Sequence, residues 1–504
     1  MKELADLLYP NVTKTIEDLE RMYPIRNLDD KAEVCRFAPS PTGRMHMGNL
    51  FASFIPEVIA NQSNGVFILR IEDTDAKRAI ENGVELILED LEHYNYIVSE
   101  HPIKGGEYGP YIQSERKEIY KEYAEKLVEM GHAYYCFCTA EELDDQRKIA
   151  DENKVPFLYD GRCSKLSKEE VEAKLASGVP YVIRQKMPKE GVTEVNDLTH
   201  GIIKIENKVL EDQILLKSDG FPTYNFANVI DDHLMEITHV IRGHEYLDQT
   251  AKYNLLYDAF GWEKPTYIHV AMVLGEDGQK LSKRNGDASF MDLYNDGYLP
   301  EAVVNYLVLL GWSPTDNQEI FTMEELIEKF DPKRISTSSS RYDVKKLRWM
   351  NSNYIKKMSD EDYLTFVKKY IDPKYDFSDK DEEWVNTLLL IYKDHISYGK
   401  EINEDIALFL NETLEPNEEC IEFMKDETVP NTINVFKNEI SSIEEWNIEN
   451  ISKAIDNTKT NAGVKGKMLY MPIRIQTTGV MHGPELPISL YLLGKETVIK
   501  RLSI

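Results

Sequence analysis

The sequence predicts a doubly wound α/β fold that is interrupted by an inserted domain and followed by an all-helical C-terminal region. Three observations predict it. A strand pattern, a tight Pro/Gly turn and a helical pattern follow one another over residues 34–60. Strand patterns return at 240–242 and 267–274. Helical patterns dominate beyond about residue 360. A chain of 504 residues also needs several domains, because one core rarely grows past about 250–300 residues.

The first elements can be placed in order. Residues 1–30 predict a helical arm, because apolar residues recur there with a partial helical period. Residues 31–115 predict the first half of the α/β domain, with strands at 34–38 and 66–71 and a helix from about 47. Ligands of such sheets bind at the carboxyl ends of the strands, so Ser40 and Glu72 are expected in one crevice.

The later elements follow from capping and periodicity. Residues 116–219 predict an insertion with short strands and with helices that begin at capping boxes, Thr139/Glu142 and Ser167/Glu170. Residues 220–290 predict the second half of the α/β domain. Residues 291–358 predict a connecting region and 359–504 the helical region.

Composition and charge exclude several classes of protein. No run of about 18 apolar residues occurs, so no membrane partner is expected. The start of the chain carries Glu3 and Asp6 and lacks the pattern of a secretory signal. Five cysteines suit a reducing cytosol, and we expect a cytoplasmic monomer. A net charge of −29 argues against a protein that coats nucleic acid indiscriminately, although local Lys and Arg can still contact RNA.

Two motifs far apart in the sequence suit a nucleotide. The turn at 36–43 (Arg-Phe-Ala-Pro-Ser-Pro-Thr-Gly) leads into 46–49 (His-Met-Gly-Asn) and a helix. Backbone N–H groups at such a helix N-terminus favour phosphate. About 235 residues later, the run at 280–284 (Lys-Leu-Ser-Lys-Arg) follows a strand pattern. Together the two elements predict a phosphate clamp that closes from two sides.

These motifs resemble the HIGH and KMSKS signatures of class I aminoacyl-tRNA synthetases. The form of the turn at 37–43, and the segments 70–75 and 224–228, are similar to the glutamyl-tRNA synthetases in particular. Asn49, Leu281 and Arg284 depart from the signatures within the variation that the family tolerates. The similarity runs from about residue 34 to the C-terminus.

The resemblance implies a Rossmann-type catalytic domain, an inserted acceptor-binding domain at 116–219, a stem-contact region at 291–358 and an anticodon-binding region at 359–504. It implies ATP-dependent activation of L-glutamate to glutamyl-adenylate and transfer to the 3′ end of tRNA(Glu), with release of AMP and pyrophosphate. The catalytic residues would be His46 and Lys283. The positions implied for ATP, which binds with Mg²⁺, are His46, Gly48, Glu245, Lys280, Ser282 and Lys283.

Recognition of glutamate requires a cation that cannot lose its proton. A guanidinium meets this need and can bind a carboxylate through two hydrogen bonds. Arg242 follows a strand pattern and Arg36 opens the first turn, so both are candidates. By resemblance the glutamate site comprises Arg36, Ser40, Glu72, Tyr224, Asn228 and Arg242.

Three cysteines form a partial metal pattern. Cys136 and Cys138 precede Cys163, one ligand short of a closed tetrahedral zinc site. In some glutamyl enzymes a Tyr completes this spacing, which Tyr159 reproduces, and we expect one Zn²⁺ per chain. The alternative is a set of buried free cysteines.

Contact with RNA is expected at a basic tract. Residues 333–357 hold eight Lys and Arg with a single acid, and Trp349 and Tyr354 lie among them. Cations with stacking rings suit RNA, although a solvated helix face would have the same spacing. The segment 383–401 contains Lys393 and His395 but no Arg, which favours an enzyme that charges tRNA(Gln) as well as tRNA(Glu).

Three other classes of protein are alternatives to a glutamyl-tRNA synthetase. A truncated relative that glutamylates a modified tRNA base lacks an anticodon domain, and the helical patterns beyond residue 350 argue against it. A non-catalytic RNA-binding paralogue would be expected to lose His46 or Lys283, and both are present. A small-molecule nucleotidyltransferase leaves the basic tract unexplained.

Overall fold

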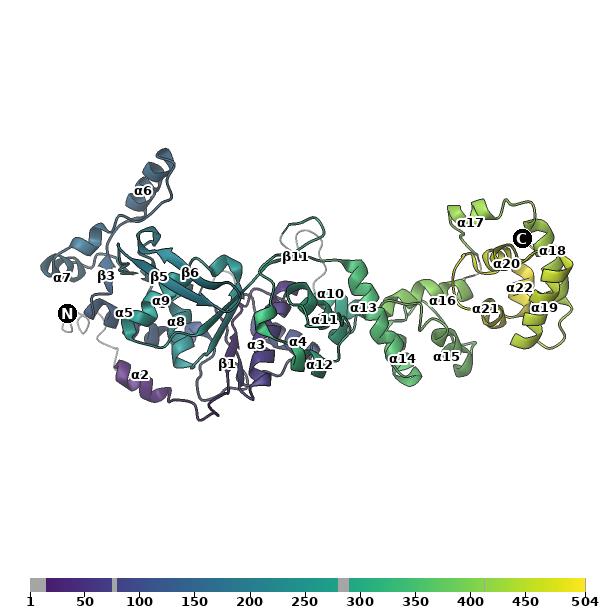
Figure 1. Cartoon of the computed structure of the whole chain (residues 1–504), viewed down its shortest axis with the longest axis horizontal. Coiled ribbons are helices and arrows are strands. Elements are labelled where there is room, and N and C mark those ends of the chain that lie inside the picture. Colours follow the sequence, from purple (N-terminus) through teal and green to yellow (C-terminus); the bar gives the residue numbers. More distant parts are fainter. Residues whose placement is uncertain (1–14, 75–78, 280–289, 412, 504) are drawn as a thin grey trace. The chain divides into compact units, whose positions relative to one another are not determined.

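The computed structural model describes residues 15–74, 79–279, 290–411 and 413–503. The chain divides into two compact units. The first unit comprises Met1–Met291 and Val304–Asp343, and the second comprises Asp292–Val303 and Val344–Ile504. Strands from distant parts of the sequence gather in the first unit (Figure 1). The domain boundaries predicted from the sequence stay predictions.

The first unit is built on a six-stranded sheet in the order β2-β1-β8-β9-β5-β6. Its strands are β1 (Val34–Phe37), β2 (Val66–Leu69), β5 (Val192–Asp197), β6 (Gly201–Glu206), β8 (His239–Gly243) and β9 (Thr266–Val270). All neighbours pair in parallel except β5 and β6. Since β2 and β8 flank β1 on opposite sides, the chain order reverses there and opens a crevice at the carboxyl ends.

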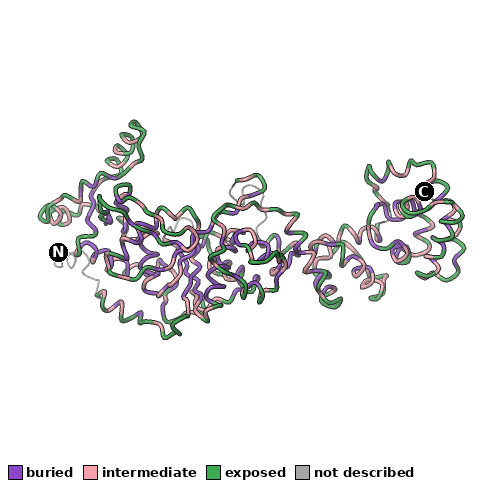
Figure 2. The backbone as a smooth tube through the Cα atoms, viewed as in Figure 1, coloured by how far each residue is buried: buried purple, intermediate pink, exposed green. Residues whose placement is uncertain are grey.

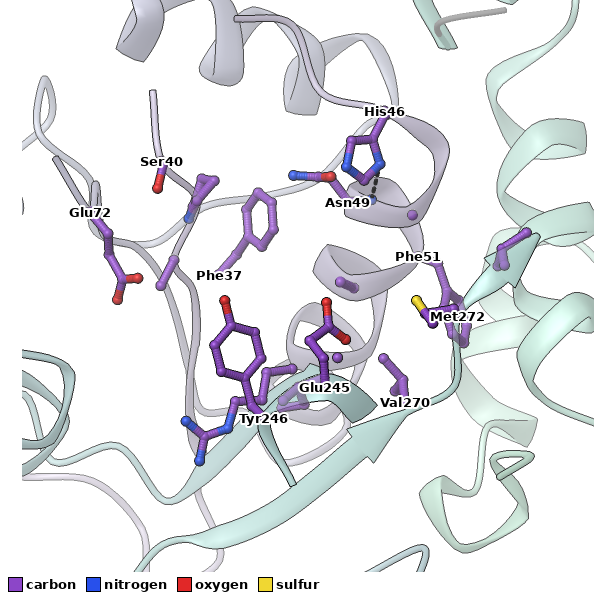
Figure 3. Close-up of a pocket in the computed structure, with 18 of the residues that line it drawn as sticks. Phe37, Ser40, His46, Asn49, Phe51, Glu72, Glu245, Tyr246, Val270 and Met272 are labelled. Carbon is purple, nitrogen blue, oxygen red and sulfur yellow. Dashed lines mark hydrogen bonds between the residues drawn. The ribbon is translucent and has the colours of Figure 1, made fainter. Parts of the chain in front are cut away.

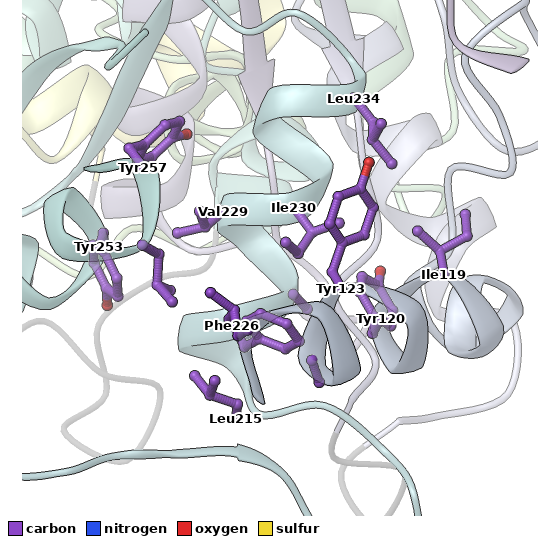
Figure 4. Close-up of a cluster of buried hydrophobic side chains, with 14 of the residues drawn as sticks. Ile119, Tyr120, Tyr123, Leu215, Phe226, Val229, Ile230, Leu234, Tyr253 and Tyr257 are labelled. Atoms are coloured by element: carbon purple, nitrogen blue, oxygen red, sulfur yellow. The ribbon is translucent and has the colours of Figure 1, made fainter. Parts of the chain in front are cut away.

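Helices pack around this sheet. They are α3 (Met47–Gln62), α4 (Gly83–His93), α5 (Lys117–Glu129), α8 (Tyr224–Leu234) and α9 (Thr250–Phe260). Three of them, α5, α8 and α9, share one hydrophobic core with the sheet. Figure 4 shows Tyr120 and Tyr123 of α5 against Phe226 and Ile230 of α8, and all four are fully buried. This packing fixes α8, whose first residue Tyr224 lines the site, relative to the sheet.

The predicted insertion divides between two sheets. Strands β3 (Ala133–Cys136), β4 (Val182–Gln185) and β7 (Ile214–Leu216) form a separate antiparallel sheet. Helices α6 (Ala140–Glu152) and α7 (Lys168–Ala176) begin at the two predicted capping boxes. Strands β5 and β6, in contrast, extend the main sheet, because Asp197 pairs with Tyr267 at the free edge of β9.

The predicted strand at 267–274 is two strands. The chain leaves the sheet after β9 at Val270 and forms β10 (Val273–Leu274), which pairs with β11 (Ser340–Arg341). The break occurs at the carboxyl edge, where Ala271 and Met272 turn to line the crevice. Helix α11 (Pro300–Gly311), α12 (Met323–Lys329) and the short turn Pro332–Arg334 follow.

The N-terminal arm packs on the first unit. Helix α2 (Ile16–Met22) buries Leu19 in the core, and Tyr23 is buried beside it. Arg26 donates two hydrogen bonds to the Glu100 carboxylate, at 2.6 and 3.0 Å. The arm is therefore anchored by apolar contacts and a half-buried ion pair.

Helices are the only regular elements of the second unit among the residues that the structure describes. Its helices are α10 (Phe290–Asp296), α13 (Val344–Lys357), α14 (Asp360–Val367), α15 (Glu382–Leu390), α16 (Ile402–Leu410), α17 (Glu418–Phe423), α18 (Val429–Ser441), α19 (Ile448–Asn461), α20 (Lys467–Thr478), α21 (Leu486–Leu493) and α22 (Lys495–Arg501). Exposed and buried residues alternate along them (Figure 2). Within the described ranges, no helix has the length and apolarity to cross a membrane.

Candidate active site

A cavity of 340 Å³ lies at the carboxyl ends of β1, β8 and β9. Figure 3 shows Glu72 on one side of it and His46 with Asn49 on the other, with Glu245 and Tyr246 between them. The predicted site residues that line it are Arg36, Ser40, His46, Gly48, Glu72, Tyr224, Arg242 and Glu245. Residues separated by up to 209 positions thus meet in one crevice.

Four predicted site residues are placed elsewhere or fall outside the description. Asn228 is buried one helical turn after Tyr224 on α8 and does not line the cavity. Its Nδ2 has no hydrogen-bond partner among the described residues. Lys280, Ser282 and Lys283 lie outside the residues that the structure describes.

His46 occupies the N-cap of α3. Its Nδ1 accepts a hydrogen bond from the backbone N–H of Asn49 at 3.3 Å. A Cβ at position 48 would lie 3.2 Å from the imidazole Cε1, so glycine lets the ring lie over the first turn. The exposed ring and the positive end of the helix dipole therefore border the same part of the cavity, which suits a phosphate.

Arg36 belongs to a buried network that is electrically balanced. Its Nε and Nη2 donate to the two oxygens of Asp232, at 3.0 and 3.2 Å. Arg70 donates to Asp232 at 2.7 Å and to Glu72 at 3.1 Å. Burial favours the neutral acid, but the guanidiniums of Arg36 and Arg70 hold the pKa of Asp232 below its usual range. Most of the charge of Arg36 is thus compensated within the protein.

Arg242 has a different environment. It is 7% exposed, and no described residue places a carboxylate oxygen within 4.0 Å of it. Its Nε donates to His269 Nε2 and its Nη2 to Thr250 Oγ1, each at 3.3 Å. The rings of Tyr246, Tyr253 and Tyr267 surround its guanidinium at 5.8, 4.4 and 5.4 Å. A buried cation without an anionic partner is costly, so this position favours an anionic ligand.

Glu72 provides the opposite charge in the lining of the same cavity. Burial raises its pKa to about 7, although Arg70 and Arg36 act against the shift. Burial and the neighbouring carboxylate of Glu72 raise the pKa of Tyr224 well above its usual value, so its hydroxyl remains a neutral donor. The cavity is therefore lined by a cation (Arg242), a titratable acid (Glu72) and a neutral hydroxyl donor (Tyr224).

A second cavity of 430 Å³ adjoins the first and shares Ser40, His46, Glu72 and Tyr224 with it. Residues 39–46 form one wall. Arg44, in that wall, is already bound to Asp90 at 2.5 Å and to Glu89 at 2.7 Å. This wall therefore presents mostly backbone and small side chains rather than an unpaired cation.

The three predicted cysteine ligands converge in the inserted sheet. The Sγ atoms of Cys136, Cys138 and Cys163 all lie within 4.8 Å of one another. The hydroxyl of Tyr159 lies 3.3 Å from both Cys136 Sγ and Cys138 Sγ. A hydrogen bond from Cys163 lowers the pKa of Cys136 to about 4, which favours a thiolate. Three sulfurs and one oxygen thus converge as in a tetrahedral zinc site.

The sequence patterns did not single out every residue of the site. Asp232 and Tyr246 were missed, as was Arg70 as an ion-pair partner of Glu72. Arg70 and Glu72 lie in one motif, so their spacing on a strand end was a usable signal. Asp232 lies on α8, eight residues after Tyr224, where no sequence signal marked it as the partner of Arg36.

Comparison with known proteins places this crevice in a family. The model described as tRNA synthetases class I (E and Q), catalytic domain, matches residues 33–349. The model of an anticodon binding domain matches 361–504. The chain belongs to the class I glutamyl- and glutaminyl-tRNA synthetases. The fold class and family predicted from the sequence are confirmed.

Relatives of this synthetase are similar over nearly their whole length. The Glutamate–tRNA ligase of Clostridium novyi is 46% identical over 481 residues, covering 93% of this chain and 96% of the relative. That of Clostridioides difficile is 42% identical, with 93% and 98% covered. A crystal structure of a glutamate tRNA ligase from Elizabethkingia meningosepticum, in complex with its amino acid, superposes with a TM-score of 0.82 at 34% identity, covering 94% and 99%.

Proposed function

We propose that the crevice activates L-glutamate with ATP through the residues described above and delivers it to the 3′ end of tRNA(Glu). The chain is a glutamate–tRNA ligase, as the names of relatives at 42–46% identity support. One observation carries the assignment of the substrate pocket: Arg242 is a buried cation with no carboxylate within 4.0 Å among the described residues. The γ-carboxylate of glutamate would supply the missing anion.

The charges of the crevice orient the substrate. The γ-carboxylate would bind Arg242, with Tyr224 and the remaining N–H groups of Arg36 as further donors. The α-ammonium would bind the Glu72 carboxylate, and Ser40 lies at the same edge. Glutamine would leave the charge of Arg242 uncompensated, so the pocket disfavours it.

ATP would occupy the side of the cavity near α3. His46 and Gly48 border the phosphates at the helix N-terminus, and Glu245 lies where the ribose would bind. Mg²⁺ enters as part of the ATP complex and offsets phosphate charge. Lys280 and Lys283, outside the described residues, would contribute the cations that the sequence predicts at the leaving pyrophosphate, and Ser282 beside them would contribute a hydroxyl.

The two chemical steps need positioning more than covalent catalysis. In the first, an α-carboxylate oxygen attacks the α-phosphorus, a P–O bond forms and the bond to pyrophosphate breaks. In the second, the oxygen of a terminal ribose hydroxyl attacks the carbonyl carbon of the mixed anhydride. The C–O bond to AMP breaks, and the hydroxyl proton passes to the departing phosphate of AMP. The cavity shared by Ser40, His46 and Tyr224 is the place we assign to the 3′-terminal nucleotide.

Zinc binding and tRNA scope belong to the same proposal. The donor set Cys136, Cys138, Tyr159 and Cys163 fits one Zn²⁺, which would stabilise the inserted sheet rather than act on ATP.

Charging of tRNA(Gln) in addition to tRNA(Glu) rests on the absence of Arg from 383–401. Both lysines of that segment form ion pairs with carboxylates of the protein, Lys393 with Asp360 and Lys400 with Asp296, so neither is an unpaired cation toward a base.

ATP–pyrophosphate exchange in the presence of tRNA(Glu) tests the proposal. We expect exchange with glutamate and at least about 10²-fold less with glutamine, since a neutral amide leaves a buried charge unpaired. Glu72→Gln should raise the KM for glutamate while the KM for ATP stays within about threefold. Equal exchange with both amino acids would overturn the assignment of the pocket.

A further inference from the structure

Arg242 can bind an anionic substrate only if no carboxylate of the protein already compensates its charge, and its hydrogen-bond partners are neutral groups. The register of β8 and β9 places Arg242 opposite His269. Arg242 Nε donates to His269 Nε2 and Arg242 Nη2 to Thr250 Oγ1, each at 3.3 Å. His269 and Thr250 are both fully buried. A neutral imidazole and a hydroxyl therefore hold the guanidinium, where Arg36 is held by a carboxylate.

The opposite edge of the imidazole fixes its protonation. His269 Nδ1 lies 2.7 Å from Asp197 Oδ2, which also accepts the backbone N–H of His269 at 3.1 Å. A carboxylate only accepts, so the ring proton resides on Nδ1 and Nε2 is left as an acceptor. Burial favours protonation of Asp197, but hydrogen bonds from His269, Thr199 and His200 hold its pKa far below the usual range.

The imidazole also remains neutral. Burial lowers the pKa of His269 below its ordinary value; the hydrogen bond to Asp197 opposes that shift and the charge of Arg242 reinforces it. A protonated ring would have no acceptor for Arg242 Nε and would add a like charge beside it. The charged groups at this point are thus Asp197 on β5 and Arg242 on β8. The Nδ1 atom of the titratable His200 ring lies 3.1 Å from the other oxygen of Asp197.

We propose that His269 is a positioning residue for the glutamate pocket: Asp197 fixes its tautomer, and its Nε2 orients Arg242 without compensating the charge of the guanidinium. Selection of glutamate over glutamine then depends on a residue that does not line the cavity. This inference rests on the role proposed above for Arg242.

Two substitutions at position 269 distinguish a role of His269 in orienting Arg242 from a role in stabilising the fold. His269→Gln keeps an acceptor oxygen near the place of Nε2, whereas His269→Asn keeps a donor near the place of Nδ1 and removes the acceptor that faces Arg242. In charging assays, His269→Asn should raise the KM for glutamate by about tenfold or more, the cost of losing one hydrogen bond to a charged group. The KM for ATP should stay within about threefold, and His269→Gln should restore most of the glutamate selectivity.

Thr250, whose Oγ1 also lies 3.2 Å from His269 Nε2, provides a second test if position 269 does not tolerate change. Thr250→Val removes the second neutral acceptor with little change of shape, and Thr250→Ser keeps it. The valine variant should lose selectivity for glutamate over glutamine, measured as the ratio of kcat/KM values, and the serine variant should retain it.

Arg242→Ala in the same assay distinguishes a failure of the positioning role of His269 from a failure of the pocket assignment to Arg242. If Arg242→Ala loses selectivity but His269→Asn and Thr250→Val keep the parent's selectivity, the positioning role is wrong and the pocket assignment survives. If Arg242→Ala keeps the parent's selectivity, both are wrong. Equal loss in His269→Gln and His269→Asn, with the KM for ATP rising alongside, would show a merely structural role and overturn the inference.

Discussion

Replacing Arg242 by alanine removes the cation that we assign to the γ-carboxylate. The side chain is 7% exposed and lines the cavity. Its hydrogen bonds to His269 and Thr250 use Nε and Nη2, and Nη1 is engaged in neither of them. The substitution deletes the charge without touching His46 or Glu72. We expect a large loss of glutamate recognition and a small loss for glutamine.

The size of the effect follows from the difference between charged and neutral partners. Truncating one member of a buried charge pair costs about 2–5 kcal/mol, which is a factor of roughly 30 to 5,000 in kcat/KM for glutamate. Glutamine, whose side chain is a neutral amide, loses only an ordinary hydrogen bond worth about 0.5–1.5 kcal/mol, which lowers its kcat/KM roughly 2- to 13-fold. The midpoints of the two ranges differ by about 2.5 kcal/mol, so the selectivity ratio should fall by roughly 70-fold.

The free energy of unfolding should fall less in Arg242→Ala than in a control variant, Arg116→Ala. Arg116 is also buried, donates to Asp231 at 2.7 Å and lies outside the cavity. Arg116→Ala leaves Asp231 less compensated and should cost about 3–5 kcal/mol of unfolding free energy. Arg242→Ala removes a cation that has no carboxylate within 4.0 Å in the described chain and should cost less.

The assay combines charging kinetics for glutamate and glutamine with denaturant unfolding of both variants. An Arg242→Ala enzyme that selects glutamate as well as the parent does would show that another residue binds the γ-carboxylate. An Arg116→Ala enzyme that loses selectivity without losing stability would show that the buried network, not Arg242, sets specificity.

Three further predictions concern other parts of the site. Because Glu72 has a pKa raised to about 7 and must ionise to bind the α-ammonium, the KM for glutamate should fall as the pH rises from 6 to 8, and this dependence should be absent in Glu72→Gln; a pH-independent parent KM contradicts it. Elemental analysis should find one zinc per chain in the parent and none in Cys138→Ser; a parent without zinc removes that claim. Lys283→Ala should slow aminoacylation by roughly 10²–10³-fold with little change in glutamate binding, measured by single-turnover charging; near-parental turnover refutes the role of this loop.

The sequence predicted the parts of the site that are written in contiguous motifs. The turn at 36–43, the N-cap His46 and Glu72 after β2 meet at the carboxyl ends of the strands because parallel sheets place those ends together. Periodicity and capping also predicted α3, α6 and α7. Local rules suffice where the determining contacts lie within a few residues.

What the sequence did not predict depends on pairs that are distant along the chain. Asp232 lies 196 residues from Arg36 and Asp197 lies 72 residues from His269, so neither pair has a local pattern. The break between β9 and β10, and the addition of β5 and β6 to the main sheet, depend on which strand edge is free. Such choices are made by tertiary packing.

The most direct test of the account is the charging of purified tRNA(Glu) and tRNA(Gln) transcripts with labelled glutamate or glutamine. We expect ATP-dependent, alkali-labile attachment of glutamate to tRNA(Glu), with tRNA(Gln) also accepting glutamate and with glutamine excluded from both. A preference for tRNA(Glu) of about 10³ or more in kcat/KM, which is about 4 kcal/mol, would refute the wider tRNA scope. Attachment of glutamine, or no ATP-dependent attachment of glutamate, would contradict the central claim.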